Sequence, residues 1–130
     1  MKTVDLIVPC YNESDVLPLF YNEVCGVIAR CPDYRFRLIF VNDGSRDDTL
    51  AQIQKLAQDD ERVKYISLSR NFGKEAAMLA GMKYAQGDYI GILDADLQHE
   101  PALVIDMLAA LEEGYDVAAA RRVDRSGESK

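Results

Sequence analysis

Short apolar runs alternate with segments of helical spacing along most of the chain. The runs are rich in β-branched residues and end in turn-forming or charged residues, which is typical of buried strands. In the segments between them, apolar residues such as Leu50, Ile53 and Leu56 recur three and four positions apart, which indicates helices packed by one face. The predicted strands are Val4–Val8, Phe36–Val41, Val63–Leu68, Tyr89–Leu93 and Asp116–Ala120, and the predicted helices are Asp15–Ala29, Asp47–Gln58, Lys74–Ala85 and Pro101–Leu111.

The alternation of strands and helices predicts an α/β fold. Helices that follow strands of this length form parallel crossovers, so we expect a mostly parallel, Rossmann-like sheet with helices on both faces. With 130 residues, the chain is expected to form one domain. Ligands of such sheets bind beyond the carboxyl ends of the strands, at a switch point in strand order.

The residues that follow the predicted strands are therefore the candidates for a ligand site. Each strand end supplies polar, charged or glycine residues, and four such ends together favour a binding crevice over ordinary loops. The ends read Pro9-Cys10-Tyr11-Asn12-Glu13, Asn42-Asp43-Gly44-Ser45, Ser69-Arg70-Asn71-Phe72-Gly73-Lys74 and Asp94-Ala95-Asp96.

The last of these ends carries the chemistry of a metal site. If the strand stays extended past Leu93, the side chains of Asp94, Asp96 and Gln98 point the same way, because side chains alternate along a strand. Carboxylate and amide oxygens suit Mg²⁺ or Mn²⁺, and Mg²⁺ is usually held by one or two carboxylates together with substrate phosphates. The alternative is a strand that simply ends in a polar turn.

Charge and composition exclude several other classes. The net charge of −7, without a dense basic run, disfavours binding to nucleic acid or to an anionic membrane surface. No apolar stretch approaches the length of about 20 residues that spans a bilayer, so we expect a soluble, cytoplasmic chain. Neither a dinucleotide-binding Gly-x-Gly-x-x-Gly pattern nor a P-loop is present, which argues against a dinucleotide dehydrogenase and against a P-loop nucleotidase.

Cysteine and histidine offer little chemistry. Cys10, Cys25 and Cys31 are odd in number and lack the spacing of a metal site, so we expect small buried or half-buried hydrophobic residues rather than disulfides. His99 is the only histidine, and without a nearby nucleophile pattern it gives little support for a catalytic triad.

Taken in order, the strand-end motifs resemble those of the family 2 nucleotide-sugar glycosyltransferases of the GT-A fold. The segments 8–13 and 41–45 resemble the family's first and second strand signatures, and 94–96 resembles its metal-binding Asp-x-Asp. Within the family, 70–74 and 96–101 most resemble the branch that transfers sugars to polyprenyl phosphates, such as dolichol-phosphate mannose synthase and the undecaprenyl-phosphate glycosyltransferases.

The resemblance implies transfer of a sugar from a UDP- or GDP-sugar to a polyprenyl phosphate, usually with inversion, with Mg²⁺ or Mn²⁺ as cofactor. It implies that Asp43 bonds the base or ribose, that the nucleoside pocket is walled by Pro9, Tyr11 and Glu13, and that Lys74 approaches the diphosphate. The implied nucleotide-binding residues are Pro9, Tyr11, Glu13, Asp43, Lys74, Asp94 and Ala95, the implied metal ligands are Asp94, Asp96 and Gln98, and the implied phosphate or acceptor contacts are Arg122 and Arg125.

Three of these residues have simpler alternatives. Lys74 can be a solvated helix residue, Asp43 a turn former, and Glu13 part of a helix start.

No residue of the chain stands out as a general base. A polyprenyl phosphate is already anionic near neutral pH, so the lack of a base is compatible with that acceptor.

The resemblance also implies how the chain divides. Residues 1–121 correspond to the donor-binding half, and 122–130 to the start of a flexible acceptor loop. The parent protein is then expected at the cytoplasmic face of a membrane, associated with it through segments outside this chain. The alternatives are a saccharide acceptor in the same family, a nucleotide-sugar-binding module without turnover and, more distantly, a flavodoxin-like or receiver-type signalling domain.

Overall fold

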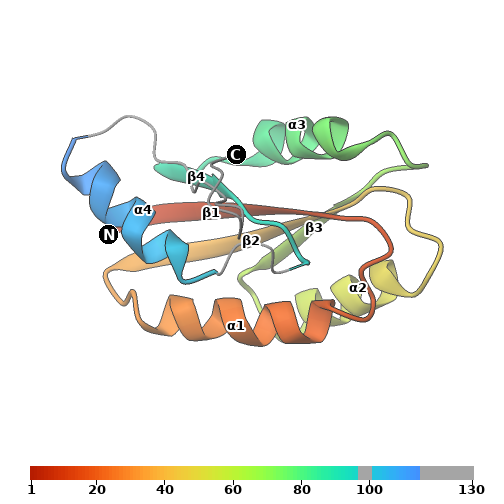
Figure 1. Ribbon diagram of the computed structural model, residues 1–130, viewed down its shortest axis with the longest axis horizontal. Helices are drawn as coiled ribbons and strands as arrows, with labels where there is room; N and C mark the ends of the chain where they lie inside the picture. The colour runs from red at the N-terminus through yellow and green to blue at the C-terminus, as the bar shows by residue number, and fades with distance from the viewer. Residues whose placement is uncertain (97–100, 115–130) are drawn as a thin grey trace, which may run out of the picture.

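The computed structural model describes residues 1–96 and 101–114, in which strands and helices alternate as predicted (Figure 1). The predicted strand Asp116–Ala120 lies outside the described residues. In chain order the elements are β1 (Lys2–Cys10), α1 (Leu17–Ala29), β2 (Tyr34–Asn42), α2 (Thr49–Asp59), β3 (Val63–Ser67), α3 (Lys74–Tyr84), β4 (Tyr89–Ile92) and α4 (Leu103–Glu112).

The four described strands form one parallel sheet in the order β3-β2-β1-β4. The chain moves outward from β1 to β2 and β3, and then crosses back to place β4 on the other side of β1. The switch point of the sheet therefore lies between the carboxyl ends of β1 and β4, where an α/β sheet binds its ligand. The predicted α/β fold with a parallel sheet is confirmed.

Helices cover both faces of the sheet, and the hydrophobic core is larger on one face than on the other. Leu6 and Val8 of β1 belong to the larger core, which also contains side chains of α1, α2 and α4. Ile7 belongs to a smaller core on the opposite face, where Ile39 of β2 and Ala77 of α3 join it. Figure 1 shows α1 and α2 on one side of the sheet and α3 on the other.

The central strands are longer than predicted. The predicted strand Val4–Val8 is extended at both ends in β1, because Lys2 pairs with Tyr34 and Cys10 pairs with Asn42 of β2. These end residues are not part of the apolar run, and only pairing with the neighbouring strand places them in the sheet.

Three helices begin later than predicted, and the last of them, α4, begins at Leu103 instead of Pro101. The first begins at Leu17 instead of Asp15, with Pro18 in its first turn, a position that suits the fixed backbone of proline. The second begins at Thr49 instead of Asp47, because the carboxylate of Asp47 accepts a 3.0 Å hydrogen bond from the backbone N–H of Thr49 and forms a turn before the helix.

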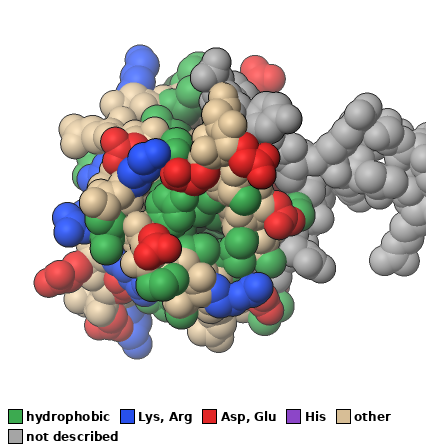
Figure 2. Space-filling view, turned by 90° about the vertical axis from the view of Figure 1, so that its left-hand side faces the viewer, with side chains coloured by type: hydrophobic (Ala, Val, Ile, Leu, Met, Phe, Trp, Pro, Cys, Tyr) green, Lys and Arg blue, Asp and Glu red, His purple; other side chains and the backbone are tan. Residues whose placement is uncertain are grey.

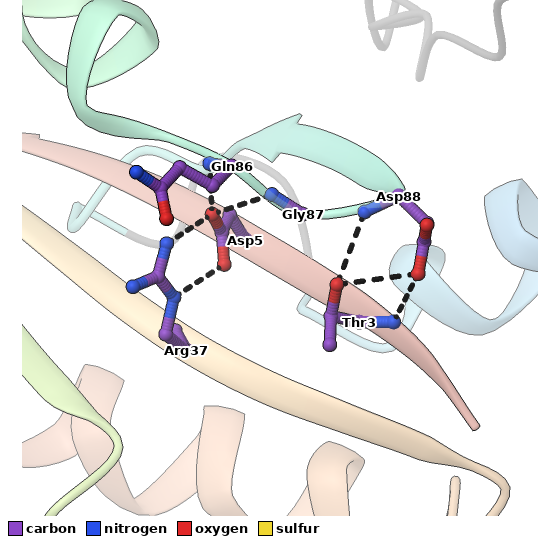
Figure 3. A network of polar contacts seen from close by, with 6 residues as sticks. All are labelled: Thr3, Asp5, Arg37, Gln86, Gly87 and Asp88. Carbon is purple, nitrogen blue, oxygen red and sulfur yellow. Dashed lines mark hydrogen bonds and ion pairs between the residues drawn. The ribbon is translucent and has the colours of Figure 1, made fainter.

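A partly buried ion pair lies on the α3 face near the amino ends of the strands (Figure 3). The Asp5 side chain is fully buried and accepts two hydrogen bonds from Arg37, its partner in the β1–β2 register, at 2.9 and 2.7 Å. The backbone N–H groups of Gln86 and Gly87 donate to the same carboxylate at 2.7 and 2.9 Å. Asp5 thereby fixes the connection between α3 and β4.

The same end of the molecule carries charges of both signs. Figure 2 views this end and shows acidic and basic side chains interspersed around a hydrophobic centre. Lys2 and Glu112 form an exposed ion pair at 3.3 Å, and the hydroxyls of Tyr34 and Tyr89 donate to the same Glu112 oxygen. Among residues 1–96 and 101–114, this face shows no dense basic surface (Figure 2).

The cysteines behave as predicted. Cys10 and Cys31 are buried, Cys25 is half-buried, and all three are free thiols. Burial raises the pKa of the Cys10 thiol, so this side chain packs as a small hydrophobic group.

Replacing Gly81 with alanine should lower the free energy of unfolding by about 1–2 kcal/mol, which urea unfolding measures. A Cβ atom at Gly81 would lie 2.4 Å from Cγ2 of Ile7, so α3 would have to move away from the sheet. Gly26→Ala is the matched control, because a Cβ atom there meets nothing within 4 Å and alanine favours the helix by about 0.5–1 kcal/mol. Equal stabilisation by both variants would contradict close packing of α3.

Candidate functional site

A cavity of about 370 Å³ opens at the carboxyl end of the sheet, beside the switch point between β1 and β4. It brings together every predicted nucleotide-binding residue, together with Asp96. The predicted residues Gln98, Arg122 and Arg125 lie outside the described residues. The cavity is lined by Pro9, Cys10, Tyr11, Glu13, Asp43, Asn71, Gly73, Lys74, Asp94, Ala95 and Asp96.

Asn12 holds the loop after β1 against the loop after β2. Its backbone is left-handed, with φ of 52°, and its N–H donates to the hydroxyl of Ser45 at 2.9 Å. The N–H of Glu13 donates to the hydroxyl of Thr49 at 2.9 Å. These contacts fix the backbone that carries Tyr11 and Glu13 at the cavity. Asn12 was not among the predicted site residues, although asparagine tolerates left-handed backbone better than most residues.

Asp43 connects the end of β2 to the loop between β3 and α3. Its buried carboxylate accepts hydrogen bonds from the N–H of Phe72 at 2.8 Å, the N–H of Gly73 at 3.0 Å and the side-chain amide of Asn71 at 3.2 Å. The turn after β2 is held by Asn42 instead, whose side-chain oxygen accepts from the N–H three residues later at 3.2 Å. Asp43 therefore lines the cavity and also positions the loop that forms another part of its wall.

The glycine of Asn-Asp-Gly-Ser is required where the loop after β2 contacts the loop between β3 and α3. Gly44 has a φ of +68°, and a Cβ atom there would lie 2.3 Å from the backbone of Arg70 and of Asn71. Only glycine allows both this conformation and this close approach.

The end of β4 differs from the extended strand considered above. The strand ends at Ile92, and Ala95 and Asp96 lie in a turn. The condition for strand alternation past Leu93 is therefore not met, and the alternative of a strand that ends in a polar turn is the one observed. The turn brings both carboxylates to the cavity instead, with Ala95 buried between them.

Negative charge is concentrated in the cavity. The pKa of Glu13 is raised by burial and then by the nearby charges of Asp96 and Asp94, whereas Lys74 acts in the opposite direction. Lys74, the first residue of α3, forms an ion pair with Asp94 at 2.6 Å between Nζ and Oδ1. Lys74 is thus exposed in part but is not merely solvated, and its ammonium offsets part of the carboxylate charge.

The oxygen donors of the cavity fit a divalent cation bound together with phosphate. Asp94 and Asp96 offer hard oxygens, and the described lining of the cavity holds four carboxylates, those of Glu13, Asp43, Asp94 and Asp96, against the single ammonium of Lys74. Within residues 1–96 and 101–114, no three carboxylate, thiol or imidazole groups lie close enough to hold a metal ion by themselves. Mg²⁺ commonly needs only one or two carboxylates, since water and substrate phosphates complete its shell.

A second cavity, of about 380 Å³, runs along β4 between α3 and α4 and shares Lys74 and Asp94 with the first. It is largely apolar, and Ile90 and Ile92 of β4 are partly exposed beside it. This groove is not predicted from the sequence, because its residues have the apolar pattern of ordinary core positions in a strand and two helices.

The parallel sheet and the helices on its two faces have the GT-A architecture that solved structures of other proteins show. A structure of S. aureus TarS 1–349 in complex with UDP-GlcNAc matches with a TM-score of 0.68 and 24% identity, over 87% of this chain and 32% of that chain. The mannosyltransferase PcManGT from Pyrobaculum calidifontis, in complex with GDP-Man and Mn²⁺, matches with a TM-score of 0.63 and 22% identity, over 72% of this chain and 27% of that chain.

The sequence comparison identifies the family. The profile of glycosyl transferase family 2 matches residues 5–130, and the chain belongs to this family. The resemblance inferred from the motifs is confirmed, and the signalling-domain alternative is wrong.

Curated relatives are 36–45% identical to this chain. Among them, the bactoprenol glucosyl transferase of Shigella phage SfV is 37% identical over 127 residues, which are 98% of this chain and 41% of that protein. The chain spans about two fifths of the length of the relatives it matches. In the part of the chain that the structure describes, no helix has the length and apolar character needed to cross a bilayer.

Proposed function

We propose that this chain is the donor-binding part of a metal-dependent, inverting glycosyltransferase that moves a sugar from a UDP- or GDP-sugar to a polyprenyl phosphate. The observation that carries the proposal is the cavity at the switch point of the sheet, where the predicted nucleotide-binding residues meet two carboxylates. The nucleotide sugars named in the PcManGT and TarS complexes support both donor classes.

In this proposal, different residues of the cavity bind different parts of the donor. The exposed ring of Tyr11 offers an apolar face for the base, and Glu13 and Asp43 offer acceptors for base or ribose donors. Lys74 lies where it can approach the diphosphate. Mg²⁺ or Mn²⁺ held by Asp94 and Asp96, with Gln98 as a further oxygen ligand, would stabilise the charge that develops on the leaving diphosphate.

Similarity and chemistry support the proposed acceptor. The SfV relative is named a bactoprenol glucosyl transferase, and bactoprenol is a polyprenol. A phosphate acceptor is anionic near neutral pH, so it attacks with less help from a general base than a sugar hydroxyl does. We propose that Arg122 and Arg125 contact donor or acceptor phosphate with forked donors, and that the parent acts at the cytoplasmic face of a membrane.

Calorimetric titration of UDP and GDP, each with and without Mn²⁺, tests the donor site directly. Metal-dependent binding of one nucleotide is the expected result and assigns the donor class. Failure of both nucleotides to bind a folded chain would contradict the proposed site. Sugar transfer from the matching donor to a short-chain polyprenyl phosphate, compared with a saccharide acceptor, then separates the two enzyme alternatives, and binding without any transfer identifies a donor-binding module.

Asp96→Ala should remove the Mn²⁺-dependent part of nucleotide binding, a loss of about tenfold or more in affinity, because one carboxylate ligand is deleted. The change in unfolding free energy should be small, since Asp96 is exposed. Asp106→Ala in α4 is the control, because this carboxylate does not line the cavity. Unchanged Mn²⁺ dependence in Asp96→Ala would exclude Asp96 as a metal ligand.

A further inference from the structure

The ion pair between Lys74 and Asp94 places a cation beside one of the two carboxylates that the proposed function assigns to the metal. The Nζ–Oδ1 distance is 2.6 Å, and the Lys74 side chain is 59% exposed whereas that of Asp94 is 22% exposed. Lys74 lines both cavities, and its positive charge lowers the pKa of Glu13. Its ammonium therefore lies close to the other carboxylates of the site as well as to Asp94.

Helix stability does not explain why a lysine occupies this position. Lys74 is the first residue of α3, and the amino end of a helix carries partial positive charge that disfavours a cation. Lys83, in the last turn of the same helix, has the favourable placement. The contact with Asp94 compensates for the unfavourable position of Lys74 and shows what its charge neutralises.

We propose that Lys74 is an exchangeable counter-cation: its ammonium neutralises Asp94 while the donor site is empty, and it is displaced toward the diphosphate when metal and nucleotide bind. This inference rests on the proposed function. Its physical basis is that the lysine ammonium and a divalent cation both carry positive charge and compete for the same carboxylate oxygen. The pair therefore lowers the affinity for metal alone and favours binding of metal together with a phosphate-bearing ligand, which supplies the ammonium with a new partner.

Titration of Mn²⁺ into the nucleotide-free chain, followed by the electron paramagnetic resonance signal of free Mn²⁺, tests the competition. We expect Lys74→Met to bind Mn²⁺ about tenfold more tightly than the native chain, because the substitution removes a competing charge and keeps a side chain of similar length. Lys83→Met is the matched control, since it changes the net charge equally on the same helix but leaves Asp94 paired. With saturating Mn²⁺, Lys74→Met should bind UDP or GDP more weakly than the native chain.

Mn²⁺ affinity of Lys74→Met that is equal to or below that of the native chain would overturn the inference, as would an equal gain in Lys83→Met. An Asp94→Asn background should abolish the difference made by Lys74→Met, and persistence of that difference would also contradict the pairing. These outcomes are separate from the proposed function, which depends on metal-dependent nucleotide binding by the native chain.

Discussion

Asp5→Ala should lower the free energy of unfolding by about 3–5 kcal/mol, because it leaves the half-buried guanidinium of Arg37 without its partner and its hydrogen-bond donors without an acceptor. It also removes the acceptor of the N–H groups of Gln86 and Gly87. A domain of this size is stable by about 5–15 kcal/mol, so the loss is a large part of the total. Urea unfolding measures the effect.

Asp88→Ala is the control for this prediction. Asp88 lies on the same connection and accepts a 2.8 Å hydrogen bond from the N–H of Thr3, but it is exposed (Figure 3). We expect a much smaller loss of stability. A loss in Asp5→Ala no larger than that in Asp88→Ala would show that the partly buried pair does not hold the sheet.

The stabilisation by Asp5 should depend on pH. Burial alone would raise the pKa of Asp5, but hydrogen bonds from Arg37, Gln86 and Gly87 outweigh burial and hold the pKa below its usual value of 3.8. A carboxyl with a lowered pKa in the folded state stabilises the protein above its unfolded pKa, and the stabilisation is lost as the pH falls through the folded pKa. The difference in stability between the native chain and Asp5→Asn should therefore shrink below pH 3.8.

Asp43→Ala should lower the free energy of unfolding by about 2–3 kcal/mol and weaken nucleotide binding both with and without Mn²⁺. The stability falls because two backbone N–H groups, those of Phe72 and Gly73, lose their acceptor. Binding weakens because the cavity loses one acceptor directly and because Gly73 and Lys74 are no longer held in its wall. Urea unfolding and calorimetric titration measure the two effects separately.

Asn71→Ala serves as the control for Asp43→Ala, since it removes one donor to the carboxylate but keeps the carboxylate itself. We expect a smaller loss of stability and a smaller loss of affinity. Full nucleotide affinity in a folded Asp43→Ala chain would remove Asp43 from the donor site and leave it a purely structural residue.

The sequence predicted the order of elements because each strand and helix carries a local apolar pattern that does not depend on its neighbours. It also predicted which strand ends meet, because the carboxyl ends of parallel strands lie along one edge of a sheet. The contacts that hold these ends together were not predicted. Asp43 accepts hydrogen bonds from a loop about 30 residues later in the chain. Nothing in the sequence of either segment indicates that the two are in contact.

Two polar contacts show why such details need the structure. Asp5 and Arg37 are partners only because of the β1–β2 register, and a shift of one residue would separate them. Lys74 and Asp94 meet because α3 begins and β4 ends at the same edge of the sheet, and because the chain turns immediately after β4. In both cases the geometry is set by packing between elements that are distant in the chain.

The hydrogen bonds of Asp43 bear on attempts to change the donor preference that we propose for this chain. One carboxylate joins the side of the cavity assigned to the base with the loop that leads into Lys74, on the side assigned to the diphosphate. A substitution chosen to accept a different base would therefore also shift the lysine, and a gain in selectivity would be accompanied by weaker binding of the diphosphate. Libraries that vary position 43 together with positions 71–74 offer a better route to new donors than changes at single positions.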